Sequence, residues 1–320
     1  MPPRPGATAP THDSSEAILL PEVPQELVEL IRSWRAPVVI AHVVPDADAL
    51  GAMLTMATAL SSGDCKPKVS LPDGSLSQKL TFMLDSAAPP VANEDDFTAA
   101  DGFLVLDTAK KSRCNVGPAL AETDWSANRP IGNIDHHETN TRFGDVNWVV
   151  EPSGSTCELV YYLLRRAEVP ISPRMASWLY AGIQTDTLGF SLPTTNAWAL
   201  KAAAHLVVLG ADVAQLGERL CRSQRQSEFE LLRIVYDNTK TLADGRLAYS
   251  TAGYDEIHNA GCTAADIDDQ ISIPRSLDGA ELAMLFSEGH KGHTRVNFRG
   301  AGSVTVVELA AEFGGGGHSQ

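Results

Sequence analysis

The chain has 320 residues, of which 43% are hydrophobic and 20% charged, and its formal net charge is −15. This length supports two domains with hydrophobic cores, and the composition excludes a disordered chain. A protein that grips long nucleic acid needs a basic surface along the backbone, which this acidic chain cannot supply on a large scale. A phosphate-ester substrate would therefore be small or short, with bound cations offsetting the local negative charge.

The N-terminal segment and the cysteines narrow the class of protein further. Residues 1–20 are rich in Pro, Ser and Thr, carry no signal-peptide pattern and are predicted to form a flexible tail. No run approaches the roughly 18 apolar residues that span a bilayer, so no membrane association is expected. The five cysteines form no CxxC pair, which favours a reducing cytoplasm over a zinc knuckle or a disulfide framework.

Three apolar runs, 36–41, 102–106 and 130–134, are predicted to be buried strands, and each is followed by side chains that can bind a metal. In an open α/β sheet the carboxyl ends of the strands share one edge, and ligands bind there. Each residue alone is also explained as a helix cap or a turn residue. The candidate ligands after these strands are His42, Asp46, Asp48, Asp107, Asp135, His136 and His137.

Helical periodicity fills the sequence between these strands. The alternation of strand and helix predicts an α/β fold with a mostly parallel, doubly wound sheet. Asp186 follows the last of these helices, and a plain helix C-terminal turn is the alternative to a metal ligand there. The remaining predictions are helices at 25–34, 76–84, 155–168 and 174–183 and after Leu50, a strand at 66–71, and a solvated acidic loop at 94–96.

The second half of the chain has a different pattern. Strands at 247–251, 281–287 and 294–298 and a helix at 303–313 describe a smaller α+β domain, with an active-site cleft expected between the two domains. The predicted limits are a tail at 1–20, a catalytic domain at 21–193, a helical linker at 194–227 and a substrate-binding domain at 228–320.

Two features of the smaller domain are candidates for anion binding. Residues 289–300 contain Lys291, Arg295, Arg299 and two histidines but no acidic residue. A soluble hairpin face is the plain alternative. Four glycines at 314–317 then precede His318, and their backbone N–H groups can bind an anion or belong to a loose tail.

Four motifs together resemble those of the DHH phosphoesterase superfamily. They are His42-x-x-Pro-Asp46-x-Asp48, Leu106-Asp107, Asp135-His-His137 and Thr185-Asp186-Thr187, in that order. Arg299 and the Gly-Gly-Gly-His318 end are similar to the DHH-associated C-terminal domain of the same proteins. The compact length is most similar to the nanoRNase/pAp-phosphatase (NrnA-like) branch. Asn297 and Arg295 depart from the family, which usually has serine and lysine at these positions.

The resemblance implies two divalent cations, most simply manganese, with magnesium or cobalt as alternatives. Such a pair activates water for in-line attack on phosphorus. Asp186 is expected beside His42 and Asp46, while Asp107 is expected to bridge both ions. The residues implied for metal binding are His42, Asp46, Asp48, Asp107, His136 and Asp186.

The resemblance also implies roles beyond metal binding. His137 would face the scissile phosphate, Asp135 would orient the histidines, and Asp107 would act with them in catalysis. Positions for the substrate would be Arg299, His318, Gly315, Gly316, Gly317, Asn297, Arg295, Arg113 and Ser155.

The activity implied is hydrolysis of very short oligoribonucleotides to 5′-mononucleotides, with removal of the 3′-phosphate of pAp as a second activity. A phosphodiesterase acting on cyclic dinucleotides or pApA is an open alternative, and so is a nucleotide-binding sensor with a degenerate site. Expected partners are short RNA, pAp or dinucleotides rather than long duplexes, and a homodimer is left open. A RecJ-like exonuclease is disfavoured, because the chain has no room for the additional nucleic-acid-binding domain of that branch.

Overall fold

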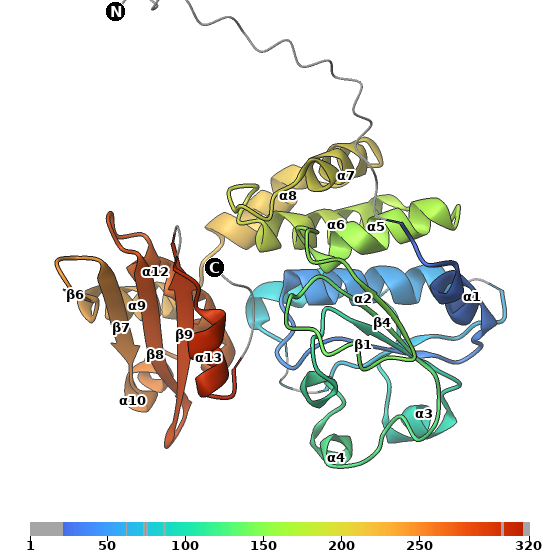
Figure 1. The fold of residues 1–320 in the computed structure, drawn as a ribbon, viewed down its shortest axis with the longest axis horizontal. Helices are drawn as coiled ribbons and strands as arrows, with labels where there is room; N and C mark the ends of the chain where they lie inside the picture. Colours follow the sequence, from blue (N-terminus) through green and yellow to red (C-terminus); the bar gives the residue numbers. More distant parts are fainter. Residues whose placement is uncertain are drawn as a thin grey trace, which may run out of the picture.

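The computed structural model describes residues 22–61, 63–72, 74, 76–85, 88–301 and 304–315. The backbone forms two lobes that lie side by side (Figure 1). The predicted tail at 1–20 and the residues Gly316, Gly317 and His318 lie outside the described residues.

The first lobe is built on a five-stranded sheet in which every neighbouring pair is parallel, with the order β2-β1-β3-β4-β5. The predicted parallel sheet is therefore confirmed. The edge strand β5 was not predicted, because only one of its four residues is buried and its apolar run is short. The strands are β1 Val38–Ile40, β2 Lys68–Val69, β3 Phe103–Leu106, β4 Ile131–Asp135 and β5 Val146–Val149.

Helices cover both faces of this sheet, as a doubly wound fold requires. The larger core lies under α1, α2, α5 and α6, and α7 packs on α5 and α6 as an outer layer (Figure 1). The smaller core lies on the other face, where Phe97 of α3 packs on Phe103 and Trp125. The helices are α1 Gln25–Ser33, α2 Ala47–Leu60, α3 Glu94–Ala99, α4 Pro118–Ala121, α5 Thr156–Arg166, α6 Pro173–Asp186 and α7 Ala197–Val208.

The predicted acidic loop at 94–96 is wrong, because these residues begin helix α3. Asn93 and Asp96 form a capping box, in which each side chain accepts the other residue's backbone N–H. Asp96 also pairs with Lys68 at 2.6 Å. The predicted helix at 76–84 is a short 3-10 helix, η1 Gln78–Met83.

Between the lobes the chain forms α8 Val213–Gly217 and η3 Glu218–Arg222. Within the described segments, no single helix combines the length and apolar character needed to cross a bilayer. Only the bent pair Ala197–Val208 and Val213–Arg222, at 120° to each other, meets both criteria jointly.

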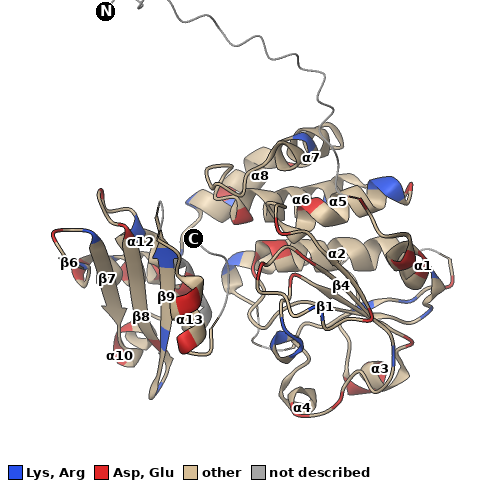
Figure 2. Ribbon diagram, in the orientation of Figure 1, with Lys and Arg blue, Asp and Glu red and all other residues tan. Residues whose placement is uncertain are grey.

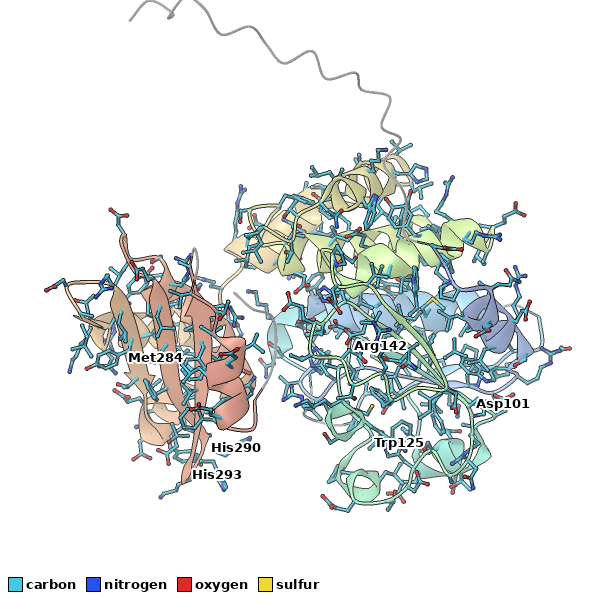
Figure 3. All side chains as sticks on the ribbon, in the orientation of Figure 1. Asp101, Trp125, Arg142, Met284, His290 and His293 are labelled. Atoms are coloured by element: carbon cyan, nitrogen blue, oxygen red, sulfur yellow. The ribbon has the colours of Figure 1, made fainter. Side chains whose placement is uncertain are left out.

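The second lobe contains a four-stranded sheet with the order β6-β7-β8-β9, in which β7 and β8 are parallel and the other pairs antiparallel. Its core is separate from those of the first lobe. Strand β9 is the sheet edge nearest the first lobe (Figure 1), and His290 and His293 mark the β8–β9 turn (Figure 3). The strands are β6 Lys240–Leu242, β7 Leu247–Ala252, β8 Leu282–His290 and β9 His293–Gly300.

The helices of this lobe pack mainly on one face of its sheet, and α13 lies beside β9 (Figure 1). The predicted smaller α+β domain is confirmed in its architecture, while the cleft and the domain limits stay predictions. The helix predicted at 303–313 corresponds to α13. The helices are α9 Gln226–Asp237, α10 Tyr254–Asn259, α11 Ala264–Ile267, η4 Asp268–Ile271, α12 Ser272–Arg275 and α13 Val307–Glu312.

Candidate metal centre

The loop from β1 to α2 carries the first three candidate ligands. Asp46, not Asp48, is the N-cap of α2, because its Oδ1 accepts the backbone N–H groups of Asp48 and Ala49 at 2.9 Å. Asp48 lies in the first turn of the helix and is only 1% exposed. The capping explanation therefore does not apply to Asp48.

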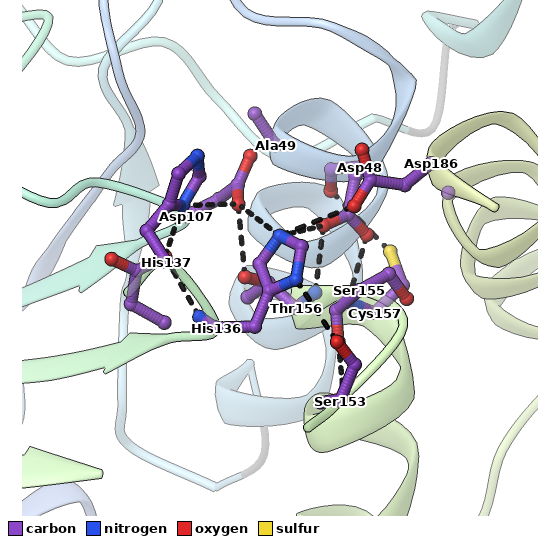
Figure 4. Close-up of polar contacts among 12 residues, drawn as sticks. Asp48, Ala49, Asp107, His136, His137, Ser153, Ser155, Thr156, Cys157 and Asp186 are labelled. Atoms are coloured by element: carbon purple, nitrogen blue, oxygen red, sulfur yellow. Dashed lines mark hydrogen bonds and ion pairs between the residues drawn. The ribbon is translucent and has the colours of Figure 1, made fainter. Parts of the chain in front are cut away.

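The Asp48 carboxylate is held by the N-terminus of α5. Its Oδ2 accepts the backbone N–H of Thr156 at 2.7 Å, and its Oδ1 accepts that of Cys157 at 2.8 Å (Figure 4). Helix α6 approaches closely because Gly182 has no side chain; a Cβ there would lie 2.7 Å from Asp48 Oδ1. The packing of three helices thus fixes the orientation of this carboxylate.

Asp107 follows β3 and has a left-handed backbone with φ of 52°, an uncommon conformation for a residue with a side chain. The side chain is 3% exposed, and its Oδ1 accepts the Thr156 hydroxyl at 3.0 Å. The Oδ2 atom lies 3.4 Å from His42 Nε2, and the Oδ1 atom lies 3.5 Å from His136 Nε2. Each oxygen of Asp107 therefore faces a different histidine, as a bridging ligand would.

The Asp-His-His triplet ends β4 and is held by hydrogen bonds. Asp135 Oδ1 lies 2.7 Å from His137 Nδ1, and Asp135 Oδ2 accepts the Asn140 amide at 2.6 Å. His136 Nδ1 lies 3.2 Å from the Ser153 carbonyl oxygen. This contact turns His136 Nε2 toward Asp107 (Figure 4).

Asp186 is the last residue of α6 and lies with a different group from the one expected. Its Oδ2 is 3.2 Å from His136 Nε2, and it forms a cluster with His136 and Asp48. The sequence analysis expected Asp186 beside His42 and Asp46, whereas the packing of α6 on α2 groups it with Asp48 and His136. His42, Asp46 and Asp107 form the neighbouring cluster.

The pKa values follow from burial and from charge in this crowded site. Burial lowers the pKa of His42, but the hydrogen bond with Asp107 and the negative charges of Asp46 and Asp107 outweigh it and raise that pKa to about 9. Burial and nearby carboxylates raise the pKa of Asp186 to about 7, and they raise that of Asp48 well above its usual range. The nearby histidines, in contrast, hold the pKa of the Asp107 carboxyl well below its usual range despite its burial.

The donor set fits divalent cations. Histidine nitrogens lie 3.2–4.0 Å from carboxylate oxygens within the two clusters. The same range holds for the contacts through Asp107 that join the clusters. Ligand bonds of about 2.0–2.3 Å to a shared cation place donor atoms at such separations. Oxygen donors with a minority of imidazoles suit manganese and similar ions. Buried carboxylates this close repel one another, and cations would relieve that repulsion.

Arg295, Asn297 and Arg299 alternate along β9 and so share one face of the strand. Arg295 Nη1 pairs with Asp268 Oδ2 at 2.6 Å, and the Asn297 amide donates to the Asp268 carbonyl oxygen at 3.1 Å. Arg299 is exposed and donates to the carbonyl oxygen of Phe298. Two of these three side chains are therefore already held by Asp268.

The other predicted substrate positions differ in exposure. Ser155 is fully buried, and its hydroxyl oxygen accepts the Glu158 N–H as the N-cap of α5, so its contact with substrate stays a prediction. Arg113 is exposed, and its carbonyl oxygen accepts the Val43 N–H at 2.9 Å, beside the His42 loop. Gly315 follows α13, and its backbone N–H donates to the Ala310 carbonyl oxygen at 2.8 Å.

Two contributions to the site were not predicted from the sequence. One is the anchoring of Asp48 by the α5 backbone, for which the Ser155-x-x-Glu158 spacing was the available signal, since it marks a helix start with N–H groups to spare. The other is Asn140, whose amide donates to Asn133 Oδ1 at 2.9 Å as well as to Asp135. No sequence pattern indicated a role for Asn140.

The chain is similar to known proteins over most of its length. Residues 37–183 match the model of the DHH family, N-terminal domain. The bifunctional oligoribonuclease and PAP phosphatase NrnA of Thermus thermophilus is 30% identical over 294 residues, which cover 91% of this chain and 85% of that protein. The protein of the same name from Bacillus subtilis is 26% identical, over 92% of this chain and 90% of its own length.

Two further proteins extend the comparison. The cyclic-di-AMP phosphodiesterase GdpP of Geobacillus thermodenitrificans is 26% identical over 91% of this chain but only 45% of its own length. The crystal structure of an exopolyphosphatase-related protein from Bacteroides fragilis has a TM-score of 0.79 at 23% identity, covering 92% of this chain and 88% of that one, which shows the same fold. The chain belongs to the DHH family.

Proposed function

We propose that this protein is a metal-dependent hydrolase that degrades very short oligoribonucleotides to 5′-mononucleotides and removes the 3′-phosphate of pAp. One observation carries the proposal: carboxylates and imidazoles from four separate segments converge at the carboxyl edge of the sheet, and Asp48, Asp107 and His136 among them are buried. The near full-length similarity to proteins named as oligoribonuclease and PAP phosphatase supports the choice of substrate.

In this proposal two divalent cations, manganese in the first instance, occupy the two clusters. His42, Asp46 and Asp107 would hold one ion. When bound, such ions polarise phosphoryl oxygens and lower the pKa of water. Asp48, His136 and Asp186 would hold the other, with Asp107 between the two groups.

His137 is the side chain that we assign to proton exchange with the substrate. Its Nδ1 atom is fixed by Asp135 at 2.7 Å, so Nε2 is the ring nitrogen that would exchange a proton. Burial lowers the pKa of His137, but the hydrogen bond to Asp135 and the negative charge of Asp107 raise it above its ordinary value. A histidine in this state can donate a proton to a leaving oxygen.

Charge supports a short substrate. Basic side chains, including Arg295 and Arg299, lie on β9, while Glu308 and Glu312 lie on the adjacent α13 (Figure 2). A small cationic face bounded by acidic residues suits one or two phosphates better than a long backbone. Arg299 would capture the far end of the substrate, as a charge-assisted contact.

A cyclic-dinucleotide phosphodiesterase is the second candidate. The similarity to the cyclic-di-AMP phosphodiesterase GdpP favours it, although this chain spans less than half of that protein. A linear dinucleotide and a cyclic one present the same bond to the metal centre, so only the surroundings separate them.

The test is a comparison of turnover by the purified protein with Mn²⁺ on four substrates: a dinucleotide, pAp, a cyclic dinucleotide and a long single-stranded RNA. The proposal predicts the highest kcat/KM on the dinucleotide, turnover of pAp, and the lowest rate on the long strand. Preference for the long strand would reject the proposal. Preference for the cyclic substrate would select the second candidate.

We also propose a cytoplasmic location. All five cysteines are free thiols, and four of them are buried, which is compatible with a reducing compartment. Cell fractionation that finds the protein in an oxidising compartment would contradict this.

A further inference from the structure

Asp268 lies where two of the predicted substrate-binding side chains meet. It begins η4, which packs against β9. Its carboxylate pairs with the Arg295 guanidinium at 2.6 Å, and its carbonyl oxygen accepts the Asn297 amide at 3.1 Å. Both partners belong to the face of β9 that also carries Arg299. An acidic residue thus sits among the cations expected to bind the substrate's anionic groups.

Arg113 of the first lobe interacts electrostatically with this pair. Arg113 extends from η2 Lys111–Arg113, which is tied through its carbonyl oxygen to Val43 in the loop after His42. Desolvation lowers the pKa of the Arg113 guanidinium, Arg295 lowers it further, and Asp268 opposes both effects. Arg113 therefore lies within electrostatic reach of the Arg295–Asp268 pair of the second lobe, and Asp268 offsets the repulsion between the two arginines.

The Arg295–Asp268 pair is open to exchange. The Arg295 side chain is 53% exposed and the Asp268 side chain 21%. An ion pair in which the arginine is this exposed adds little to the stability of the fold. A phosphate group offers the guanidinium the same arrangement of oxygens as a carboxylate and carries a higher charge. A dianionic phosphomonoester can therefore replace Asp268 on Arg295 more readily than a monoanionic phosphodiester can.

We propose that Asp268 is a specificity-determining residue, whose carboxylate occupies Arg295 until a phosphomonoester group of the substrate, remote from the scissile bond, takes its place. Asp268 reduces the positive charge of this part of β9. It therefore narrows the difference in affinity between ligands with a terminal phosphomonoester and ligands without one. The identity of the substrate rests on the proposed function, whereas the exchange of anions on Arg295 does not.

Equilibrium binding tests the proposal without hydrolysis. Adenosine 3′,5′-bisphosphate, which carries two phosphomonoesters, and adenosine 3′,5′-cyclic monophosphate, which carries only a phosphodiester, are titrated into the full chain by calorimetry in chelator. The wild type is compared with Asp268→Asn, Arg295→Gln and the double variant. The matched control is Glu281→Gln, which alters another acid of the same lobe that pairs with an arginine, Arg246, at 3.8 Å. Circular dichroism checks that each variant is folded.

Asp268→Asn should tighten bisphosphate binding by about ten-fold, the scale of one charge-assisted contact, and binding of the cyclic monophosphate by less than about three-fold. Arg295→Gln in the same chain should remove the gain, because the two side chains act as a pair. Glu281→Gln should change neither affinity. Equal affinities of wild type and Asp268→Asn for the bisphosphate would overturn the proposal, as would an equal gain for both ligands.

A second measurement separates this inference from the proposed function. Turnover of a dinucleotide with a 5′-phosphate is compared with turnover of the same dinucleotide without it, in wild type and Asp268→Asn. The variant should raise the ratio of the two kcat/KM values. Wild-type turnover with an unchanged ratio would contradict only the role of Asp268. No turnover of either dinucleotide by the wild type, together with the predicted bisphosphate affinities, would contradict only the proposed function.

Discussion

The metal centre of the first lobe and the cationic face of β9 are built in opposite ways. Asp48, Asp107 and Asp135 are at most 3% exposed, and backbone or side-chain donors hold each carboxylate. Arg295 and Arg299, in contrast, are exposed on an edge strand. The centre that would do chemistry is fixed before any ligand arrives, whereas the surface that would select the ligand can exchange its partners.

This difference has a physical reason. Catalysis requires charges that are already oriented, since reorientation during the reaction raises the barrier. A substrate site for short oligomers must instead release its product, and long side chains held only by exposed ion pairs permit this. Changes in the metal centre should therefore affect chemistry, and changes on β9 should affect capture.

The largest effect is expected for Asp107→Ala. It should lower kcat/KM by about 10³-fold or more, the scale of losing a preorganised electrostatic group, because both clusters use this carboxylate. The control is Asp101→Ala at the opposite end of β3, where the carboxylate accepts the Arg35 and Ala36 N–H groups. The control should lose stability but keep full metal stoichiometry. Wild-type turnover in Asp107→Ala would refute the bridging role.

Arg299→Ala should mainly raise KM. Loss of a charge-assisted contact weakens binding by about 1.5–3 kcal/mol, or roughly ten- to hundred-fold. Arg246→Ala removes another exposed arginine, one that pairs with Glu281, and should leave KM unchanged. Steady-state kinetics on a dinucleotide gives both constants. A fall in kcat at constant KM would contradict the assignment to capture.

Asn140→Ala should have a smaller effect, about ten-fold on kcat, as for other partners of metal-site residues. Its amide holds Asp135 Oδ2 at 2.6 Å, and Asp135 in turn holds His137. Asn147→Ala is the control, since that side chain bonds locally with the backbone of Gly144. Rates that fall equally in both variants would point to a general loss of packing.

The smallest effect concerns pH. The pKa of His42, raised to about 9, and that of Asp186, raised to about 7, mean that the metal-free fold binds protons more tightly than the unfolded chain. The stability contributed by His42 is complete below its ordinary pKa of 6.5 and is lost as the pH rises through about 9. The stability contributed by Asp186 is complete below its ordinary pKa of 3.8 and is lost as the pH rises through about 7.

Thermal unfolding in chelator should therefore show a Tm that falls between pH 6.5 and about 9. The rise in Tm on adding Mn²⁺ should grow over the same interval, because cations displace those protons. A His42→Gln variant should show a weaker dependence. A metal effect that is independent of pH would contradict this balance between protons and cations.

The parts of the site that were predictable from sequence lie next to buried strands. The runs before His42, Asp107 and Asp135 are apolar enough to identify strand ends, and parallel strands necessarily bring those ends to one edge. The parallel sheet and the smaller α+β lobe followed from the same periodicity.

What could not be predicted depends on packing between distant segments. The position of Asp186 is set by the close approach of α6 to α2 at Gly182, which leaves no periodic signal. Asp268 lies in a short helical segment whose residues show neither strand nor helix periodicity, so its pairing with Arg295 was not expected. Ser155 was predicted to contact substrate because its position at a helix start was known and its burial was not.

The most direct test of the central claim is anomalous diffraction from a crystal grown with Mn²⁺. The account predicts two peaks at the carboxyl edge of the sheet. One should be bounded by His42, Asp46 and Asp107, and the other by Asp48, His136 and Asp186, with Asp107 in contact with both. A single peak, or manganese bound elsewhere while these side chains keep their present positions, would contradict it.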